Sequence, residues 1–306
     1  MIVPHIVKSS KLYKEVMELG QQKGISITFN EFFKGSPESQ KGWLGSTRYI
    51  KEMKSIRIGI ASSSLSDQTV FIHELLHAKS YLLGYPGIQK YSNIPFPPFM
   101  NLIMESMQNT IHHLFVYREM KLLGVCQKSI DTDFFENIKQ GIKNKVEGIG
   151  KLAIICNLLE VYVRDESVAE EMVEIIKETH QEELYLYNLA KRALKETNSP
   201  AEMRKTFISI LKIINDFVKE ETKEDLFLNI IIKVDPIFPD TLLPLKASST
   251  LQAVRLKGFP HDFVLDKRDN QCCWFLSRNG EPLEDNYVNS LLNQCTLQQF
   301  LHLINE

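Results

Sequence analysis

Apolar side chains follow two different periods along the first third of the chain. Some segments repeat them every three or four residues, the spacing of an amphipathic helix, and others alternate them with polar residues or hold them in short runs, as strands do. Stretches that contain serine, proline and glycine separate these segments, as expected of turns. The predicted order is a helix over 9–22, strands over 25–29, 43–49 and 55–61, and helices over 67–83 and 97–123.

Beyond Gly124 the pattern changes to successive helical stripes, followed by a shorter segment of mixed character. Helices are predicted over 131–146, 148–164, 167–197 and 200–221. Strands are then predicted over 251–256, 261–265 and 272–276, and one or two helices over 286–304. We therefore expect an α+β protein, predominantly helical, with domains over 1–124, 125–222 and 223–306, of which the second is helical and the third is a small α+β domain.

Composition narrows the classes of protein to which the chain can belong. Its 306 residues are 43% hydrophobic, enough for two or three packed units, and a net charge of −2 at pH 7 gives no general attraction to nucleic acid or to an anionic membrane. The longest apolar run, 152–163, is too short to span a bilayer, the N-terminus lacks a secretory pattern, and the five cysteines have no paired spacing. We expect a soluble cytoplasmic protein with no nucleic-acid partner and no membrane partner.

A motif in the helix predicted to follow the strands indicates a chemistry. His73, Glu74 and His77 form an H-E-x-x-H motif. Two histidines four residues apart lie on the same face of a helix, so both imidazoles can bind one Zn²⁺ while Glu74 accepts a proton from water. Asp67 can cap the start of this helix, and Gly84 follows its predicted end. The motif predicts a zinc hydrolase, and the alternative is an amphipathic core helix whose histidines are ordinary buried polar groups.

Four-coordinate zinc needs a third protein ligand, and the next predicted helix offers candidates. Glu105 is the first charged residue on that helix, and Asn109 and His112 fall within the same narrow angular band. A carboxylate on an otherwise apolar stripe needs a partner, which a metal ion would supply. We predict Glu105 as the third ligand of one Zn²⁺ per chain, with a solvated glutamate on the outer face of the helix as the structural alternative.

The H-E-x-x-H motif followed by Glu105-x-x-x-Asn109 resembles the gluzincin branch of zincin metallopeptidases, especially the minigluzincins. In that family the second helix carries E-x-x-x-D, and the aspartate orients a zinc-binding histidine. Here Asn109 stands at the aspartate position, and its amide oxygen can accept the same hydrogen bond without adding charge. The resemblance implies a zincin-like N-terminal domain with a helix, a small sheet, the H-E-x-x-H helix and the second ligand helix. The ImmA/IrrE-type intracellular peptidases, which act on regulatory proteins, are more distantly similar.

The resemblance also implies a mechanism. Glu74 accepts a proton from water at the metal and passes it to the leaving amine, which makes it the general base of an endopeptidase. The oxyanion needs a further donor, for which we rank His112 first, with His113, Tyr81 and Tyr117 as alternatives. A protein or peptide substrate is expected, with narrow specificity or a regulatory protein partner, because a soluble protease must not digest indiscriminately. The rival hypotheses are a non-catalytic metal-binding sensor or scaffold, and a helical interaction protein with a chance motif.

The strand predicted just before the metal-binding helix has two interpretations. An edge strand at that place can hydrogen-bond an extended peptide across the metal. The candidate runs from Ile56 to Ile60, with Arg57 opposite its apolar face. An ordinary half-buried interior strand has the same pattern.

Overall fold

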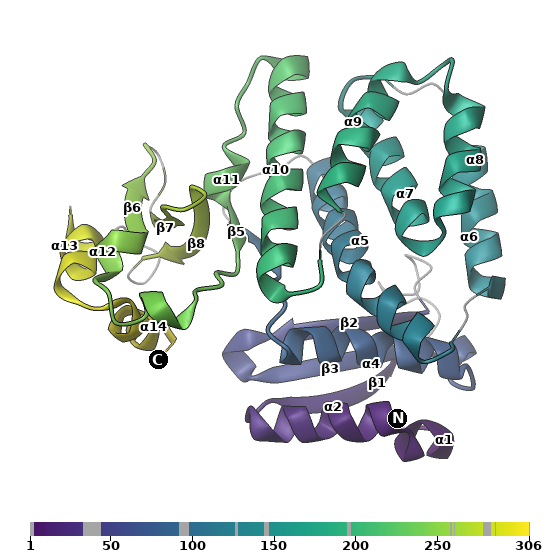
Figure 1. Ribbon diagram of the computed structural model, residues 1–306, viewed down its shortest axis with the longest axis horizontal. Helices are drawn as coiled ribbons and strands as arrows, with labels where there is room; N and C mark the ends of the chain where they lie inside the picture. The colour runs from purple at the N-terminus through teal and green to yellow at the C-terminus, as the bar shows by residue number, and fades with distance from the viewer. Residues whose placement is uncertain are drawn as a thin grey trace. The chain divides into compact units, whose positions relative to one another are not determined.

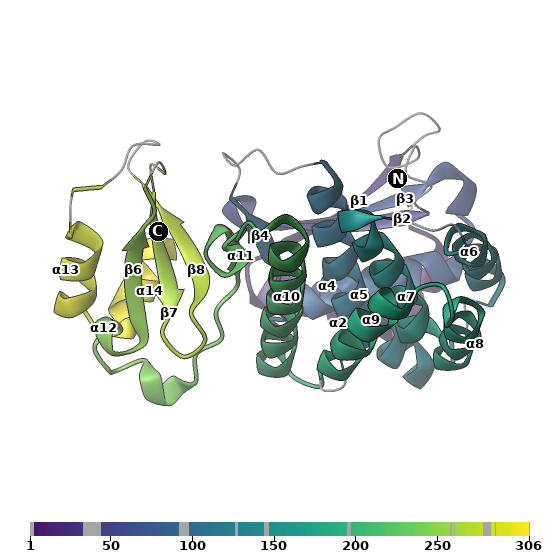
Figure 2. The same ribbon diagram turned by 90° about the horizontal axis from the view of Figure 1, so that it is seen from above.

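The computed structural model describes residues 3–32, 44–91, 98–125, 128–143, 147–194, 197–257, 259, 261–277, 283–284 and 286–305 (Figure 1 and Figure 2). Within these residues the chain is a mixed α+β protein in which helices predominate, as the pattern predicts. It divides into two compact units. The first holds Met1–Tyr85, Asn109–Lys145 and Asn157–His180, and the second holds Pro86–Gln108, Val146–Cys156 and Gln181–Glu306. The predicted domain boundaries near 124 and 222 differ from this division and stay predictions.

The N-terminal part of the first unit follows the predicted order of helix, strands and helix. The Ser10 side chain begins the first long helix, because its hydroxyl accepts a hydrogen bond from the Tyr13 backbone N–H. The predicted start of the second strand, at Trp43, lies outside the described residues. The elements are α1 (His5–Ser9), α2 (Lys11–Gln22), β1 (Ser26–Phe32), β2 (Gly45–Ile50), the 3₁₀ helix η1 (Lys51–Met53), β3 (Ser55–Ala61), the 3₁₀ helix η2 (Ser62–Ser64) and α4 (Gln68–Leu82).

The three strands form one sheet in the order β1, β3, β2. β1 is parallel to β3, and β2 is antiparallel to it, with Gly45 opposite Ile60. The side chains of Ile56, Ile58 and Ile60 on β3 are fully buried. The prediction of this segment as an edge strand is wrong, because β3 has a partner on both sides, and the interior alternative is confirmed. Among the described residues, β2 is hydrogen-bonded to another strand on one side only.

α4 carries the H-E-x-x-H motif, and its ends have the residues that the sequence predicts. Asp67 accepts a 2.9 Å hydrogen bond from the Thr69 backbone N–H at the start of the helix. Gly84, with φ of +81°, follows its end in the left-handed region that favours glycine. The helix contacts α2, β2 and β3, and its Phe71 and Leu75 side chains are fully buried. These contacts hold the motif beside the sheet.

The rest of the first unit is helical. It contains the second halves of α5 (Pro98–Leu122) and α7 (Lys151–Arg164) and all of α6 (Lys128–Gly141) and α8 (Glu166–Ile176). Figure 1 and Figure 2 both show α6 and α8 side by side. Ile111 and Phe115 on α5 and Leu158 and Val161 on α7 are buried, as apolar residues on the packing faces of these helices.

The second unit combines helices with two small sheets. Besides the first halves of α5 and α7 and the 3₁₀ helix η3 (Gly148–Gly150), it contains β4 (Ile88–Lys90), α9 (Gln181–Ala193), α10 (Pro200–Thr222), α11 (Leu228–Ile231), β5 (Ile232–Val234), the 3₁₀ helix η4 (Asp240–Leu242), α12 (Ala247–Thr250), β6 (Leu251–Arg255), β7 (Asp262–Asp266), β8 (Gln271–Leu276), α13 (Tyr287–Gln294) and α14 (Leu297–Asn305). β4 pairs with β5, and β6, β7 and β8 form an antiparallel sheet close to the predicted strand positions. Leu251, Val264, Leu292 and Phe300 belong to the core between this sheet and the last two helices.

Of the helices that the structure describes, none has the length and apolar character needed to cross a bilayer.

Burial leads us to expect that two cysteine thiols are unreactive in the folded chain. Cys156 and Cys273 are buried, and desolvation raises the pKa of each thiol to about 12. Because the thiolate is the nucleophile, only about one such thiol in 10⁴ is ionised at pH 8. We expect iodoacetamide to label neither residue in the native protein and both in urea, as measured by peptide mass spectrometry. Labelling of the native chain at the rate seen in urea would contradict their placement.

Candidate metal centre

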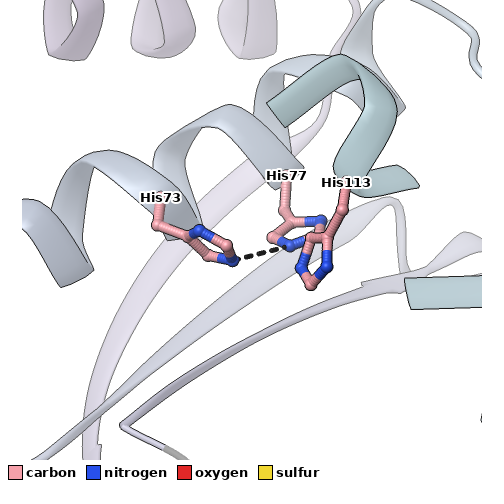
Figure 3. Close-up of side chains that lie close together, drawn as sticks. All are labelled: His73, His77 and His113. Carbon is pink, nitrogen blue, oxygen red and sulfur yellow. Dashed lines mark hydrogen bonds between the residues drawn. The ribbon is translucent and has the colours of Figure 1, made fainter. Parts of the chain in front are cut away.

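The two histidines of the motif project from one face of α4. Their Nε2 atoms, on His73 and His77, lie 3.1 Å apart, and their ring centroids lie 4.9 Å apart (Figure 3). Two nitrogens bound to one tetrahedral zinc at about 2.0 to 2.1 Å would lie about 3.3 Å from each other. The pair therefore has the spacing of two ligands of a single ion.

A third histidine reaches this pair from α5. The ring centroid of His113 lies 5.0 Å from that of His73 and 5.1 Å from that of His77. Figure 3 shows the three rings converging from two helices, and one ligand atom of each lies within 4.8 Å of the other two. Within the described ranges, this is the one group of three histidine, cysteine, aspartate or glutamate side chains with such a spacing. We call it the histidine cluster.

Glu105, the predicted third ligand, is not part of the histidine cluster. It is exposed on α5, eight residues before His113. Eight residues of α-helix correspond to about 12 Å along the axis. The prediction placed this carboxylate on the apolar stripe of the helix, whereas the structure places it outside that stripe, where water can reach it. The structure thus places His113, and not Glu105, next to His73 and His77, and Glu105 is exposed.

The other two predicted residues of α5 also lie elsewhere than expected. Asn109, predicted to orient a zinc ligand, is exposed. His112, predicted as a catalytic donor, is 1% exposed, and its Nδ1 lies 3.2 Å from the hydroxyl oxygen of Ser80. Its ring centroid lies 5.1 Å from that of Tyr81 and 6.3 Å from that of His77. This placement makes His112 a buried neighbour of His77 rather than a side chain presented to a substrate.

Burial keeps both histidines of the motif neutral. Desolvation is the largest cause that holds the pKa of His73 and of His77 well below 6.5, and the neighbouring histidines lower both pKa values further. A neutral imidazole keeps a lone pair on one ring nitrogen, and this is the form that binds a metal ion. The low pKa values therefore keep both rings in the neutral form that a metal ion requires.

The side chain of Glu74 projects from α4 and contacts the neighbouring strand β2. Its side chain is buried, and its Oε2 accepts a 2.6 Å hydrogen bond from Oγ1 of Thr47 on β2. Gly45 on the same strand approaches so closely that an added Cβ would lie 2.6 Å from Oε1 of Glu74. Desolvation raises the pKa of Glu74 to about 7, against the opposing effect of the Thr47 hydrogen bond. The carboxyl group therefore has a fixed direction and a proton affinity far above that of an exposed glutamate.

A buried carboxylate from α7 contacts the third histidine. Oε1 of Glu160 lies 2.7 Å from Nδ1 of His113 and accepts a 2.7 Å hydrogen bond from Nε of Arg164. Burial alone would raise the pKa of Glu160, but His113 and Arg164 outweigh it and hold the pKa well below its ordinary value. The sequence predicts only helix packing for this segment. The one signal of this role is a glutamate that interrupts the apolar run over 152–163.

Tyr117 on α5 lies beside two rings of the histidine cluster. Its ring centroid lies 5.0 Å from that of His113 and 5.7 Å from that of His73. Among the described residues its buried hydroxyl has no hydrogen-bond partner. Burial is the largest cause that raises the pKa of Tyr117 well above 10, so the hydroxyl keeps its proton at neutral pH and can donate it. Of the four donors considered from sequence, Tyr117 is the one with a buried hydroxyl available for a new bond.

Comparisons with known proteins add no family assignment. The chain was compared with protein-family models, with curated proteins and with solved structures, and none of these comparisons gave a match. What the chain does is therefore inferred from the geometry and chemistry of the histidine cluster and its neighbours.

Zinc titration distinguishes His113 from Glu105 as the third ligand. We expect His113→Ala to weaken zinc binding by more than about 100-fold, because loss of a ligand should exceed the 10- to 100-fold effect of losing a group that only orients one. Glu105→Ala, on the same helix, is the matched control and should bind zinc as the wild type does. Weaker binding in Glu105→Ala together with unchanged binding in His113→Ala would restore the ligand predicted from sequence.

Substitution of Gly45 tests the contact between β2 and Glu74. A Cβ at this position would collide with the Glu74 carboxyl group, so we expect Gly45→Ala to lower the free energy of unfolding by about 1 to 3 kcal/mol, as overpacking does. Gly141→Ala is the control, because nothing lies within 4 Å of the Cβ it would add. Chemical denaturation measures both variants, and a Gly45→Ala protein as stable as Gly141→Ala would contradict the close approach.

Proposed function

We propose that the chain is a zinc-dependent peptidase whose metal ion is held by His73, His77 and His113. The observation that carries the proposal is the convergence of three histidine ligand atoms within 4.8 Å, beside a glutamate from the same motif. Three protein ligands leave one position of a tetrahedral zinc for water or substrate, which is typical of catalytic rather than structural sites. An H-E-x-x-H helix with a glutamate between its histidines is the usual arrangement for metal-assisted hydrolysis.

The donor set fits zinc. Imidazole nitrogen is among the common ligands of this borderline ion, and catalytic zinc sites with three histidines are well known. The 3.1 Å between the Nε2 atoms of His73 and His77 is close to the separation expected of two zinc ligands. The low pKa of each of these rings keeps it in the form that binds metal. We therefore expect one zinc ion per chain.

Two side chains of this chain supply the remaining chemistry. A zinc ion in the histidine cluster would make water more acidic and would polarise a substrate carbonyl. Glu74 accepts the proton of the attacking water and returns it to the departing amine, and the Thr47 hydroxyl holds the carboxylate in one orientation for this transfer. The Tyr117 hydroxyl is the donor that we assign to the developing oxyanion, in place of His112.

The position of β2 supports a peptide as the substrate. β2 contacts α4 and carries both Gly45 and Thr47, the two residues that touch Glu74. β2 pairs with β3 on one side, and a peptide that extended the sheet on the other side would bind through backbone hydrogen bonds. A peptide added there would run past Glu74. We therefore propose that a peptide substrate binds along β2, because β3 lies inside the sheet.

Substitution of Glu74 tests the proposed chemistry. We expect the zinc-loaded wild type to cleave members of a mixed peptide library, and a chelator to abolish this cleavage until zinc is restored. Glu74→Gln should keep its zinc and lose about 10²- to 10⁴-fold in rate, the usual contribution of a general base. Mass spectrometry of the library measures the cleavage rates of the wild type and of Glu74→Gln. Glu105→Gln, an exposed acid of α5, is the matched control with an unchanged rate.

The outcomes separate the peptidase from its rivals. Zinc binding without cleavage of any peptide would favour a metal-binding sensor or scaffold. Cleavage by Glu74→Gln at the wild-type rate would remove Glu74 from the mechanism, and absence of zinc binding would reject the metal site itself.

A further inference from the structure

The hydrogen bond between His113 and Glu160 decides which ring nitrogen of His113 is available to a metal ion. Nδ1 of His113 lies 2.7 Å from Oε1 of Glu160. An ionised carboxylate only accepts hydrogen bonds, so Nδ1 carries the proton and donates it. The lone pair of the ring then resides on Nε2. Without such a partner, either nitrogen could carry the proton and the ring could turn.

Both oxygens of the Glu160 carboxylate are engaged, which fixes its plane. Oε1 also accepts a 2.7 Å hydrogen bond from Nε of Arg164, and Oε2 accepts a 2.8 Å bond from Oγ1 of Thr110. Thr110 and His113 are three residues apart, on neighbouring turns of α5. The helix that provides the third histidine therefore also holds the carboxylate that orients it.

Arg164 keeps the Glu160 charge paired in a largely buried place. The side chains of Glu160 and Arg164 are only 12% and 14% exposed. Nη1 of Arg164 donates a 2.8 Å hydrogen bond to Asp131 on α6, and its guanidinium carbon lies 4.1 Å from the ring centroid of Phe134. A buried charge that loses its partner is strongly destabilised, so Arg164 holds the Glu160 carboxylate in place beside His113, and Asp131 in turn holds the Arg164 guanidinium.

We propose that Glu160 is a positioning residue of the metal centre, and that Asp131 and Arg164 make helices α6 and α7 a required part of it. This inference rests on the proposed function and deepens it, because it names what controls the affinity of the same site. Glu160 lies 47 residues beyond His113, in a segment without a metal ligand of its own. Zinc affinity then depends on the packing of α7 against α5, and bound zinc stabilises that packing in return.

Zinc affinity of the full chain, measured by competition with a chromophoric chelator, tests this role. Glu160→Ala is expected to weaken zinc binding about 10- to 100-fold. Glu160→Gln keeps an acceptor oxygen but loses the charge, so its affinity should lie between those of Glu160→Ala and the wild type. Glu174→Gln is the matched control, because it removes an exposed ion pair with Lys177 within α8. It should bind zinc as the wild type does.

A second readout separates positioning from mere support of the fold. The visible absorption of the Co²⁺-substituted protein reports the ligand geometry, and it should shift in both Glu160 variants and not in Glu174→Gln. A purely structural role would lower the melting temperature of the metal-free protein and leave the spectrum of the folded, loaded protein unchanged. If Glu160→Ala does not fold, Glu160→Gln decides.

The failures of the two proposals are distinguishable. Wild-type zinc binding that is lost in His113→Ala establishes the metal site independently of Glu160. If that site is present and the Glu160 variants bind zinc and absorb like the wild type, the positioning role alone is overturned. A wild-type chain that binds no zinc overturns the proposed function and this role together.

Discussion

The contact between the motif helix α4 and the second half of α5 is the constraint on which the rest of the site depends. It brings His113 to His73 and His77, whose own Nε2 atoms lie 3.1 Å apart on α4. Because burial opposes protonation of His73 and His77, both rings are neutral. The two rings share one N–H in a hydrogen bond between these nitrogens, and in the proposed metal-bound form both lone pairs would face the ion instead.

The elements around this contact each hold one part of the site. β2 holds Glu74 through the Thr47 hydroxyl, and α7 holds His113 through Glu160. A further ion pair fixes the helices themselves, because Lys79 on α4 lies 2.9 Å from Glu15 on α2 and 3.3 Å from Glu119 on α5. The residues that would carry out the chemistry are therefore held by contacts that involve five elements, β2, α2, α4, α5 and α7. The sheet and the later helices act as a scaffold for a few side chains.

Local sequence signals predict the motif helix well. The Asp67 cap, the helical period and the left-handed Gly84 all depend on residues near one another in the chain, so α4 lies close to where the pattern predicts it. The spacing of His73 and His77 likewise needs only helix geometry. The strands and the mixed C-terminal segment are found from the same kind of local evidence.

What the sequence cannot predict depends on how distant elements pack. The choice between Glu105 and His113 depends on how far α5 is turned about its axis relative to α4, and no local pattern reports that rotation. The pairing of β1 with β3, rather than with the next strand in the chain, moves β3 to the interior of the sheet. The role of Glu160 depends on a contact across 47 residues, in a helix whose pattern indicates packing alone.

X-ray absorption spectroscopy of the zinc-loaded chain tests the central claim most directly, because it reports the atoms bound to the metal. Coordination by three imidazole nitrogens at about 2.0 to 2.1 Å, with one further light-atom ligand, is the predicted result. The imidazole signal should fall from three rings to two in His113→Ala. A zinc ion bound by only two imidazoles and a carboxylate in the wild type would contradict the histidine cluster as the metal centre.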